Sequence, residues 1–341
     1  MIRLRVSSWF RRVCAVALAC LVVAGPSPAY AYLKFGYDVN GTSFTLKWTK
    51  GPVRYYVTAA SVTSVSATQM QEAVARAFAT WQAVPTASIS YEFAGFTRDL
   101  PGEDDGRSTL GFLDQPELDR VLASTSFLID DATGELVESD IFFNSAFPWS
   151  VATAGERGRW DLESIALHEI GHLSGLGHSA IGETDIAATG GRRVLSSGAV
   201  MFPIAMGSGD ITGRMLQADD VAGISDLYPD NGFNSKTGSL SGHVLKDGAG
   251  VYGAHVVAFS LATGNQVANF TLNRSGAFSI AGLRPGPHLV RVEPLDDAET
   301  ESFFDPSMPT DIDFAPLFYE RLVVVPRGGD SGLVTLEVNW P

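Results

Sequence analysis

Residues 168–178 read H-E-I-G-H-L-S-G-L-G-H, a spacing that can bind a metal ion. His168 and His172 are four residues apart, so on a helix they lie on one face and their imidazoles can hold one ion. Glu169 lies beside them and can act on a water molecule at that ion. These residues predict metal-assisted hydrolysis, with Glu169 as the general base.

Gly175 and His178 complete the pattern H-E-x-x-H-x-x-G-x-x-H. A glycine lets the chain leave the helix in a conformation that other residues resist. The turn can then bring His178 back as a third ligand. Three histidines and one open position indicate a catalytic zinc site, because a structural zinc is closed by a fourth protein ligand.

The extended motif fixes five residues in eleven positions, so a chance occurrence is improbable. The segment resembles the metzincin metalloproteases, and HEIGHLSGLGHS is most similar to their matrixin branch, the matrix-metalloprotease-like family. The resemblance covers about residues 45–229. It implies a zinc metalloendopeptidase with one catalytic zinc that acts on proteins or peptides.

A methionine downstream of the third histidine extends the resemblance. Residues 199–203 read A-V-M-F-P, similar to the matrixin A-L-M-Y-P, in which the methionine forms a hydrophobic floor beneath the metal. Met201 and Pro203 are therefore expected to support the site, together with Gly175. A tyrosine usually follows that proline by two residues, whereas this chain has Ala205, so the resemblance implies nothing about the specificity of its substrate pocket.

The elements that must position these residues read as a mixed α and β domain. An amphipathic helix is expected over 66–81, with its apolar stripe in the core and with Ser66 and Gln69 as a capping box. The active-site helix is expected over 162–174. Strands are expected at 52–58, 88–93, 109–113, 122–129 and 139–143. The fold class implied is an α+β metzincin domain with a twisted five-stranded sheet and three helices.

The third helix closes this domain. Residues 216–228 are similar to the family's L-x-x-D-D-x-x-G-I-x-x-L-Y segment, and Pro229 ends it. Asp219 and Asp220 are expected to cap and anchor this helix rather than to take part in the chemistry.

One strand is expected to hold the substrate. By analogy with the upper rim of the family's cleft, an extended peptide would pair with an edge strand. The residues expected there are Leu122, Ala123, Ser124, Thr125, Ser126 and Phe127.

Two features depart from the family. Matrixins carry histidines for a second, structural zinc before the active-site helix, but no histidine precedes His168 here, which makes a structural zinc doubtful. The acidic residues of this region could hold calcium, or they could form a solvated loop; they are Asp130, Asp131, Glu135, Glu138 and Asp140. The stretch between His178 and Met201 is also longer than in vertebrate matrixins, so 182–197 is expected to be an insertion at the rim of the cleft.

A second domain is expected at 237–341. Short strand signals alternate with glycine and aspartate turns, and residues 274–286 resemble a motif of carboxypeptidase-regulatory-like, transthyretin-like β-sandwich domains. Its expected role is accessory: binding, spacing or surface display. His243, His255 and His288 are expected to be ordinary surface or strand residues. The first domain is expected to span 32–230, and the turn-forming residues 231–236 are expected to be a linker.

Residues 1–31 read as a secretory signal peptide. A basic start precedes an apolar run that is too short for a membrane span, and an A-x-A cleavage site ends at Ala31. A lipoprotein attached at Cys20 is a weaker alternative. Both cysteines, Cys14 and Cys20, lie in this segment, so the mature chain has none. We therefore expect a secreted enzyme without a cysteine switch. Few residues separate Ala31 from the first expected strand, so no pro-domain is expected.

The net charge of the mature chain limits the classes of molecule it can bind. Removing four arginines from 24 basic residues leaves 20 against 38 acidic residues, a balance of −18. Such a chain is a poor partner for nucleic acid or anionic membranes. We expect a monomer that acts on a protein or peptide substrate.

Two other functions remain open from sequence alone. One is a secreted binding or adhesion protein with a vestigial protease fold, which should have lost Glu169 or a histidine; none of these is lost. The other is a zinc enzyme that acts on a non-peptide bond.

Overall fold

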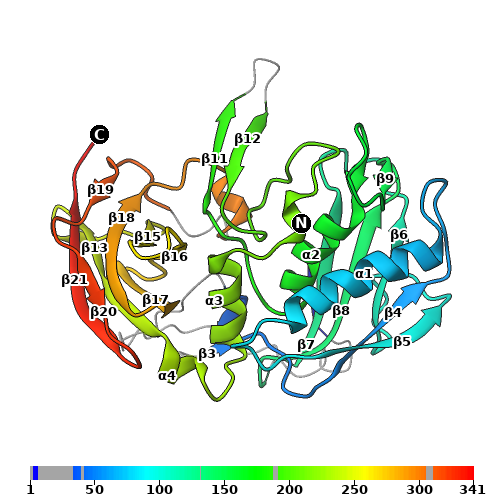
Figure 1. Cartoon of the computed structure of the whole chain (residues 1–341), viewed down its shortest axis with the longest axis horizontal. Coiled ribbons are helices and arrows are strands. Elements are labelled where there is room, and N and C mark those ends of the chain that lie inside the picture. The colour runs from blue at the N-terminus through cyan, green and yellow to red at the C-terminus, as the bar shows by residue number, and fades with distance from the viewer. Residues whose placement is uncertain (1–2, 7–33, 40–41, 131, 187–190, 305–309) are drawn as a thin grey trace, which may run out of the picture.

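The structure is a computed structural model that describes residues 3–6, 34–39, 42–130, 132–186, 191–304 and 310–341. Two parts lie side by side in Figure 1: a mixed α/β part up to about residue 230 and a β-rich part that follows it. Among the described residues, no helix combines the length and the apolar character needed to cross a membrane. Most of the predicted signal peptide lies outside the described residues.

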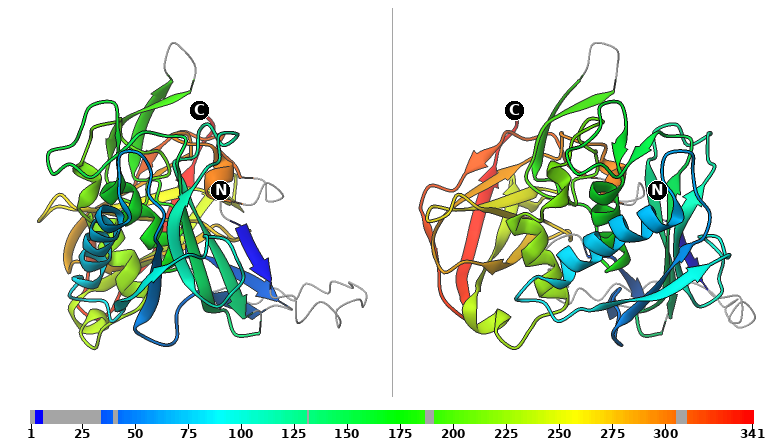
Figure 2. Two further views of the ribbon diagram at one scale, coloured as in Figure 1. Left: turned by 90° about the vertical axis from the view of Figure 1, so that its right-hand side faces the viewer. Right: turned by 45° about the vertical axis from the view of Figure 1, so that its right-hand side comes forward.

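A mixed sheet forms the first part. Its strands are, in order, β5 (Tyr91–Thr97), β4 (Val53–Thr58), β6 (Ser108–Leu113), β8 (Glu135–Asn144), β7 (Ala123–Asp130) and β1 (Arg3–Val6). The first four run parallel, and β7 is antiparallel to β8. The five expected strands are present, although β5 begins three residues later than expected. The additional strand β1 comes from the predicted signal peptide and pairs in parallel with β7 (Figure 2).

Two helices pack against each other beside this sheet. Helix α1 (Ala67–Gln82) has the predicted capping box of Ser66 and Gln69, and its expected apolar stripe is buried. Helix α2 (Leu162–Leu173) carries His168, Glu169 and His172 of the motif. Trp81 of α1 donates from Nε1 to the carbonyl of Leu167 on α2 at 2.8 Å. The packing fixes the height of the active-site helix over the sheet.

Helix α3 (Ala218–Leu227) closes the first part and is tied to the end of α2. The Tyr228 hydroxyl donates to the carbonyl of Ser174 at 2.7 Å and accepts from the backbone N–H of Trp48 at 3.0 Å. The segment predicted as a linker contains a short helix, α4 (Phe233–Lys236), whose Phe233 is buried. The connection between the two parts is therefore packed.

The second part contains two sheets. One has β14 (Ala249–Gly250), β13 (Gly238–Lys246) and β17 (Ala277–Leu283), with β21 (Asp330–Val338) paired to β13. The other has β16 (Gln266–Phe270), β15 (His255–Ser260), β18 (Gly286–Glu293) and β19 (Leu317–Phe318), with β20 (Val323–Val325) paired to β18. Side chains of both sheets, such as Phe278 and Val290, share one apolar core. The three histidines of this part lie on strands as expected, but His255 and His288 are buried rather than on the surface.

The remaining elements are short. They are β2 (Gly36–Val39), β3 (Thr42–Thr45), β9 (Trp149–Ser150), β10 (Trp160–Asp161), η2 (Thr212–Arg214) and η3 (Thr300–Ser302). The expected insertion forms a hairpin of β11 (Gly182–Ile186) and β12 (Arg192–Ser197). It projects from the top of the molecule in Figure 1, between the two parts.

Candidate active site

The three histidines of the motif meet at one point. His168 and His172 lie one turn apart on α2, and His178 returns from the turn that follows the helix. Their ligand nitrogens all lie within 4.8 Å of one another. Nε2 of His172 is 3.1 Å from Nε2 of His178.

Gly175 makes this return possible. Its φ of +100° lies in the left-handed region, where a side chain is strained. A Cβ at this position would also lie 2.4 Å from the carbonyl oxygen of Leu46. Both the backbone conformation and the space therefore require glycine here, as the sequence predicted.

Each imidazole is oriented by a backbone carbonyl. Nδ1 of His168 donates to Val200 at 2.7 Å, and Nδ1 of His172 donates to Leu176 at 2.8 Å. Nδ1 of His178 donates to Ser302 at 2.6 Å. Because a carbonyl can only accept, each Nδ1 carries a proton, and in the neutral imidazole this leaves the lone pair on Nε2.

Burial keeps two of these imidazoles neutral. It lowers the pKa of His172 well below its usual value and that of His178 to about 3, and the nearby His168 adds to both shifts. Two lone-pair nitrogens 3.1 Å apart are compatible only if a cation or a proton lies between them. Neutral imidazoles of this geometry suit a zinc ion.

Glu169 lies beside the histidines and is buried. The hydroxyl of Thr125 on β7 donates to its Oε2 at 2.6 Å and thereby fixes one carboxylate oxygen. The sequence placed Thr125 only on the expected substrate strand. No local pattern links two residues that are 44 positions apart, so this contact could not be found from the sequence.

Met201 lies against the active-site helix as expected of the methionine turn. A Cβ at Gly171 of α2 would lie 2.2 Å from its sulfur, so the first glycine of the segment makes room for this methionine. Asp220 accepts from the backbone N–H groups of Val200 at 2.9 Å and Met201 at 3.1 Å. It also accepts from Gln217 at the start of α3, which agrees with its expected anchoring role.

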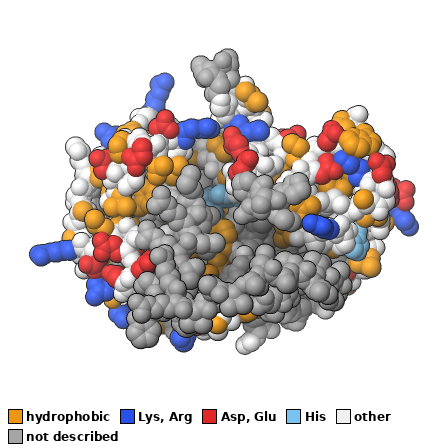
Figure 3. All heavy atoms as spheres, turned by 180° about the vertical axis from the view of Figure 1, so that it is seen from behind, with side chains coloured by type: hydrophobic (Ala, Val, Ile, Leu, Met, Phe, Trp, Pro, Cys, Tyr) orange, Lys and Arg blue, Asp and Glu red, His pale blue; other side chains and the backbone are white. Residues whose placement is uncertain are grey.

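A cleft of about 710 Å³ opens at the histidines. Histidine atoms are visible in a hollow near the middle of the face shown in Figure 3. One wall contains residues 119–125, and another contains 202–207, including Pro203 and Ala205. Of the expected substrate strand, Leu122, Ala123, Ser124 and Thr125 line the cleft. Ser126 and Phe127 do not line it, and they pair with β1, a strand of the predicted signal peptide.

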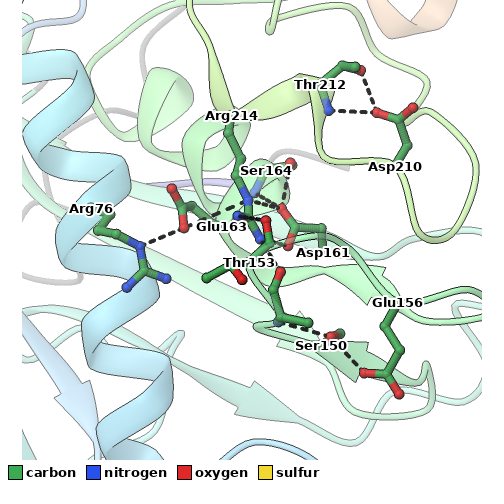
Figure 4. A network of polar contacts seen from close by, with 11 residues as sticks. Arg76, Ser150, Thr153, Glu156, Asp161, Glu163, Ser164, Asp210, Thr212 and Arg214 are labelled. Atoms are coloured by element: carbon green, nitrogen blue, oxygen red, sulfur yellow. Dashed lines mark hydrogen bonds and ion pairs between the residues drawn. The ribbon is translucent and has the colours of Figure 1, made fainter.

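A polar network fixes the wall that follows the methionine turn (Figure 4). Arg214 holds the Asp161 carboxylate with two bonds, from Nε at 2.9 Å and from Nη2 at 2.5 Å. Asp161 also accepts from the backbone N–H of Ser164 and so caps the start of α2. Arg76 of α1 contacts Glu163 of α2 at 2.7 Å in the same region. No local sequence pattern indicates this network, because it joins segments far apart in the chain.

The acidic residues considered for calcium have other partners. Glu138 accepts from the backbone N–H groups of Asp105 and Gly106, and Asp140 accepts from that of Thr109. Glu135 pairs with Lys50. Asp131 lies outside the described residues. Within the described part of the chain, only the three histidines form a group of at least three metal-binding side chains.

Comparison with known proteins identifies the family. The matrixin family model matches residues 47–229, which is more than half of the chain. The chain therefore belongs to the matrixin family, whose members are zinc-dependent metalloproteases with a metzincin α/β fold.

Curated relatives agree with this membership. The chain is 42% identical over 71 residues to Metalloendoproteinase 5-MMP of Arabidopsis thaliana, which is 21% of this chain and 15% of that protein. It is 32% identical over 106 residues to Metalloendoproteinase 4-MMP of the same plant, which is 30% of this chain and 26% of that protein. The matches thus span about a quarter or less of these relatives.

A solved structure, the Bacillus anthracis TIE protein, is similar over 31% of this chain and 17% of that chain, with 13% identity and a TM-score of 0.22. A similarity this low supports no statement about fold or function.

Proposed function

We propose that this chain is a secreted zinc endopeptidase that hydrolyses peptide bonds in proteins. The observation that carries the proposal is the joint geometry of three carbonyl-oriented histidines and the buried Glu169 at an open cleft. The proposed domains are a signal peptide at 1–31, a catalytic domain at 32–230 and a β-sandwich at 237–341, with 231–236 between them.

The proposed mechanism assigns a role to each residue of the site. His168, His172 and His178 hold the metal, and a bound zinc supplies a Lewis acid that activates water and polarises the substrate carbonyl. Glu169 removes a proton from the attacking water and returns it to the leaving nitrogen. Thr125 fixes one oxygen of that carboxylate and leaves the other for the water.

We propose that the substrate pairs with the exposed part of β7. Leu122, Ala123, Ser124 and Thr125 line the cleft beside Glu169. Their backbone can add an extended peptide to the sheet. Proline at successive positions of a peptide substrate should block cleavage where it removes a needed N–H. Cleavage that tolerates proline at every position would contradict this mode of binding.

The structure of the second part supports our proposal that it is a carboxypeptidase-regulatory-like β-sandwich. Its two sheets enclose one core. The Asn273 side chain accepts from the backbone N–H groups of Ser275 and Ala277, which closes the turn before the strand of the recognised motif.

Secretion is tested by the N-terminus of the mature protein. The signal peptide predicts that the protein recovered outside the cell begins at Tyr32. Recovery of a full-length chain starting at Met1, or of a lipid-modified Cys20, would contradict the proposed cleavage site.

The catalytic assignment is tested with Glu169→Ala. The variant should keep its zinc and its fold but lose hydrolysis of casein and gelatin, because the histidines remain and only the base is removed. Zinc content and unfolding temperature are the controls. A variant that cleaves at the wild-type rate would show that the mechanism is wrong. A wild-type protein that binds zinc but cleaves no peptide would favour a binding protein or a non-peptide hydrolase.

A further inference from the structure

A segment of the second part reaches the metal site. We name residues 299–304 the rim turn; this segment contains η3 (Thr300–Ser302). The carbonyl of Ser302 in this turn accepts the Nδ1–H of His178 at 2.6 Å. The acceptors of the other two histidines, Val200 and Leu176, belong to the first part. One of the three orienting contacts thus crosses between the parts.

Aromatic packing holds the rim turn in this position. The ring of Phe303 meets that of His178 edge to face, with centroids 6.1 Å apart, and also contacts Phe270 at 5.5 Å. Phe304 is buried with Phe270 and with Ala180, which lies two residues beyond His178. The turn is therefore packed against both parts at once.

The rim turn also forms part of the cleft. Glu299 and Ser302 line it on the side of His178. Just before the turn, the Asp297 carboxylate accepts from the backbone N–H of Thr184 at 2.7 Å, at the base of the β11–β12 hairpin. The hairpin in turn lines the cleft through Arg192 and Ser197. The second part and the insertion together build this end of the cleft.

The interface behind the turn leaves little freedom for the second part to move away. Ala222 of α3 belongs to the apolar core of the second part. A Cβ at Gly282 of β17 would lie 2.8 Å from the Cβ of Ala222. Asp219 of α3 accepts from the backbone N–H of Ala268 on β16 at 2.9 Å. Contacts this close define one relative position of the two parts.

We propose that the second part is a working component of the active site: through the rim turn it orients the third zinc ligand and forms one end of the cleft. This inference rests on the proposed role of His178 as a zinc ligand. It replaces the accessory role expected from the sequence with a direct one. Ser302 is a positioning residue, because it acts on the metal only through His178.

Phe303→Ala in the full-length chain tests the proposal. Removing the ring should weaken zinc binding about ten-fold, as loss of contacts that orient a metal ligand commonly does. Zinc affinity is measured by competition with a chelator of known affinity. Phe318→Ala is the matched control, since Phe318 is an exposed aromatic of the same part on β19. An affinity of Phe303→Ala within two-fold of wild type would overturn the proposal.

A second variant separates orientation from general stability. The backbone N–H of Ser302 donates to Glu299 at 2.9 Å, so Ser302→Pro removes a bond that shapes the turn. In zinc-loaded protein with ¹⁵N-labelled histidine, exchange of the Nδ1 proton of His178 should speed up at least about ten-fold. The corresponding protons of His168 and His172 should be unaffected. Equal acceleration at all three, or at none, would contradict the role of the rim turn.

Zinc binding and peptide cleavage by the wild-type protein separate a failure of the proposed function from a failure of the inference about the rim turn. If it binds no zinc, the proposed function fails. If it binds zinc and cleaves peptides while both rim-turn variants keep wild-type affinity and exchange, only the further inference fails.

Discussion

At the scale of single residues, hydrogen bonds to neighbouring groups orient the side chains of the site and leave one reactive atom of each side chain free. Carbonyls occupy every Nδ1 of the three histidines, so every Nε2 faces the metal position. Thr125 occupies one oxygen of Glu169. The proposed chemistry therefore relies on neighbours that orient the reactive groups as much as on the groups themselves.

Thr125→Val tests the partner of the base. Valine keeps the shape of threonine but cannot donate to Glu169, so kcat should fall about ten-fold. Zinc content should not change, because the Thr125 hydroxyl donates to Glu169 rather than to a histidine. Thr125→Ser, which restores the hydroxyl, should recover most of the rate. A valine variant with unchanged kcat would show that the contact has no catalytic role.

Gly171→Ala tests the fit between the helix and the methionine turn. A Cβ here would overlap the sulfur of Met201, so the free energy of unfolding should fall by about 1–3 kcal/mol. Gly207→Ala is the control, because its Cβ would meet no heavy atom within 4 Å. Urea unfolding of both zinc-free variants provides the measurement. Equal stability of the two would contradict the close approach of Met201 to α2.

At the scale of elements, two buried carboxylates that the sequence suggested as calcium ligands accept hydrogen bonds from backbone N–H groups instead. Glu138 and Asp140 on β8 accept from backbone N–H groups of the loop between β5 and β6, and Asp140 also accepts from that of Thr109 on β6. Burial, followed by the nearby Asp140, raises the pKa of Glu138 to about 7. A raised pKa means that the folded state binds this proton more tightly than the unfolded state does.

The pH dependence of Glu138→Gln follows from that shift. The stability that a raised pKa contributes is fully present below about 4.5 and is lost as the pH rises through about 7. Glutamine does not titrate. The unfolding free energy of the variant relative to wild type should therefore increase between pH 4.5 and 7, by at most about 1.4 kcal/mol per pH unit. Glu92→Gln, at an exposed site on β5, is the control. A difference that does not vary with pH would contradict the shift.

Elements with local signals could be predicted, and contacts between distant segments could not. The capping box of α1, the left-handed Gly175 and the anchoring Asp220 each follow from a few neighbouring residues. The contact of His178 with Ser302 spans 124 positions and uses a backbone carbonyl, which leaves no mark in the residue type. The turn-forming residues 231–236 likewise gave no sign that Phe233 would be buried and form part of α4.

At the scale of the whole molecule, the two parts share their cores and one face of the cleft. Ala222 of the first part packs in the core of the second, and Ala180 packs with Phe304. Composition suggests a domain boundary at about residue 230, but the two parts are packed together across it. Substrate selection should depend on both parts.

Shared cores predict shared unfolding. Calorimetry of the zinc-loaded chain should give one cooperative transition, because separating the parts exposes apolar surface in both. Adding zinc should raise the midpoint temperature of this transition, because a ligand that binds only the folded state stabilises that state. Two resolved transitions, with zinc shifting only one of them, would show that the second part is independent of the metal site.

X-ray absorption at the zinc edge of the full-length protein would identify the ligands of the metal. We expect one zinc per chain with three imidazole nitrogens in its first coordination shell, reduced to two in His178→Ala if that variant still binds zinc. A wild-type chain that folds in zinc-replete medium but carries no zinc, or whose zinc lacks these three imidazoles, would contradict it.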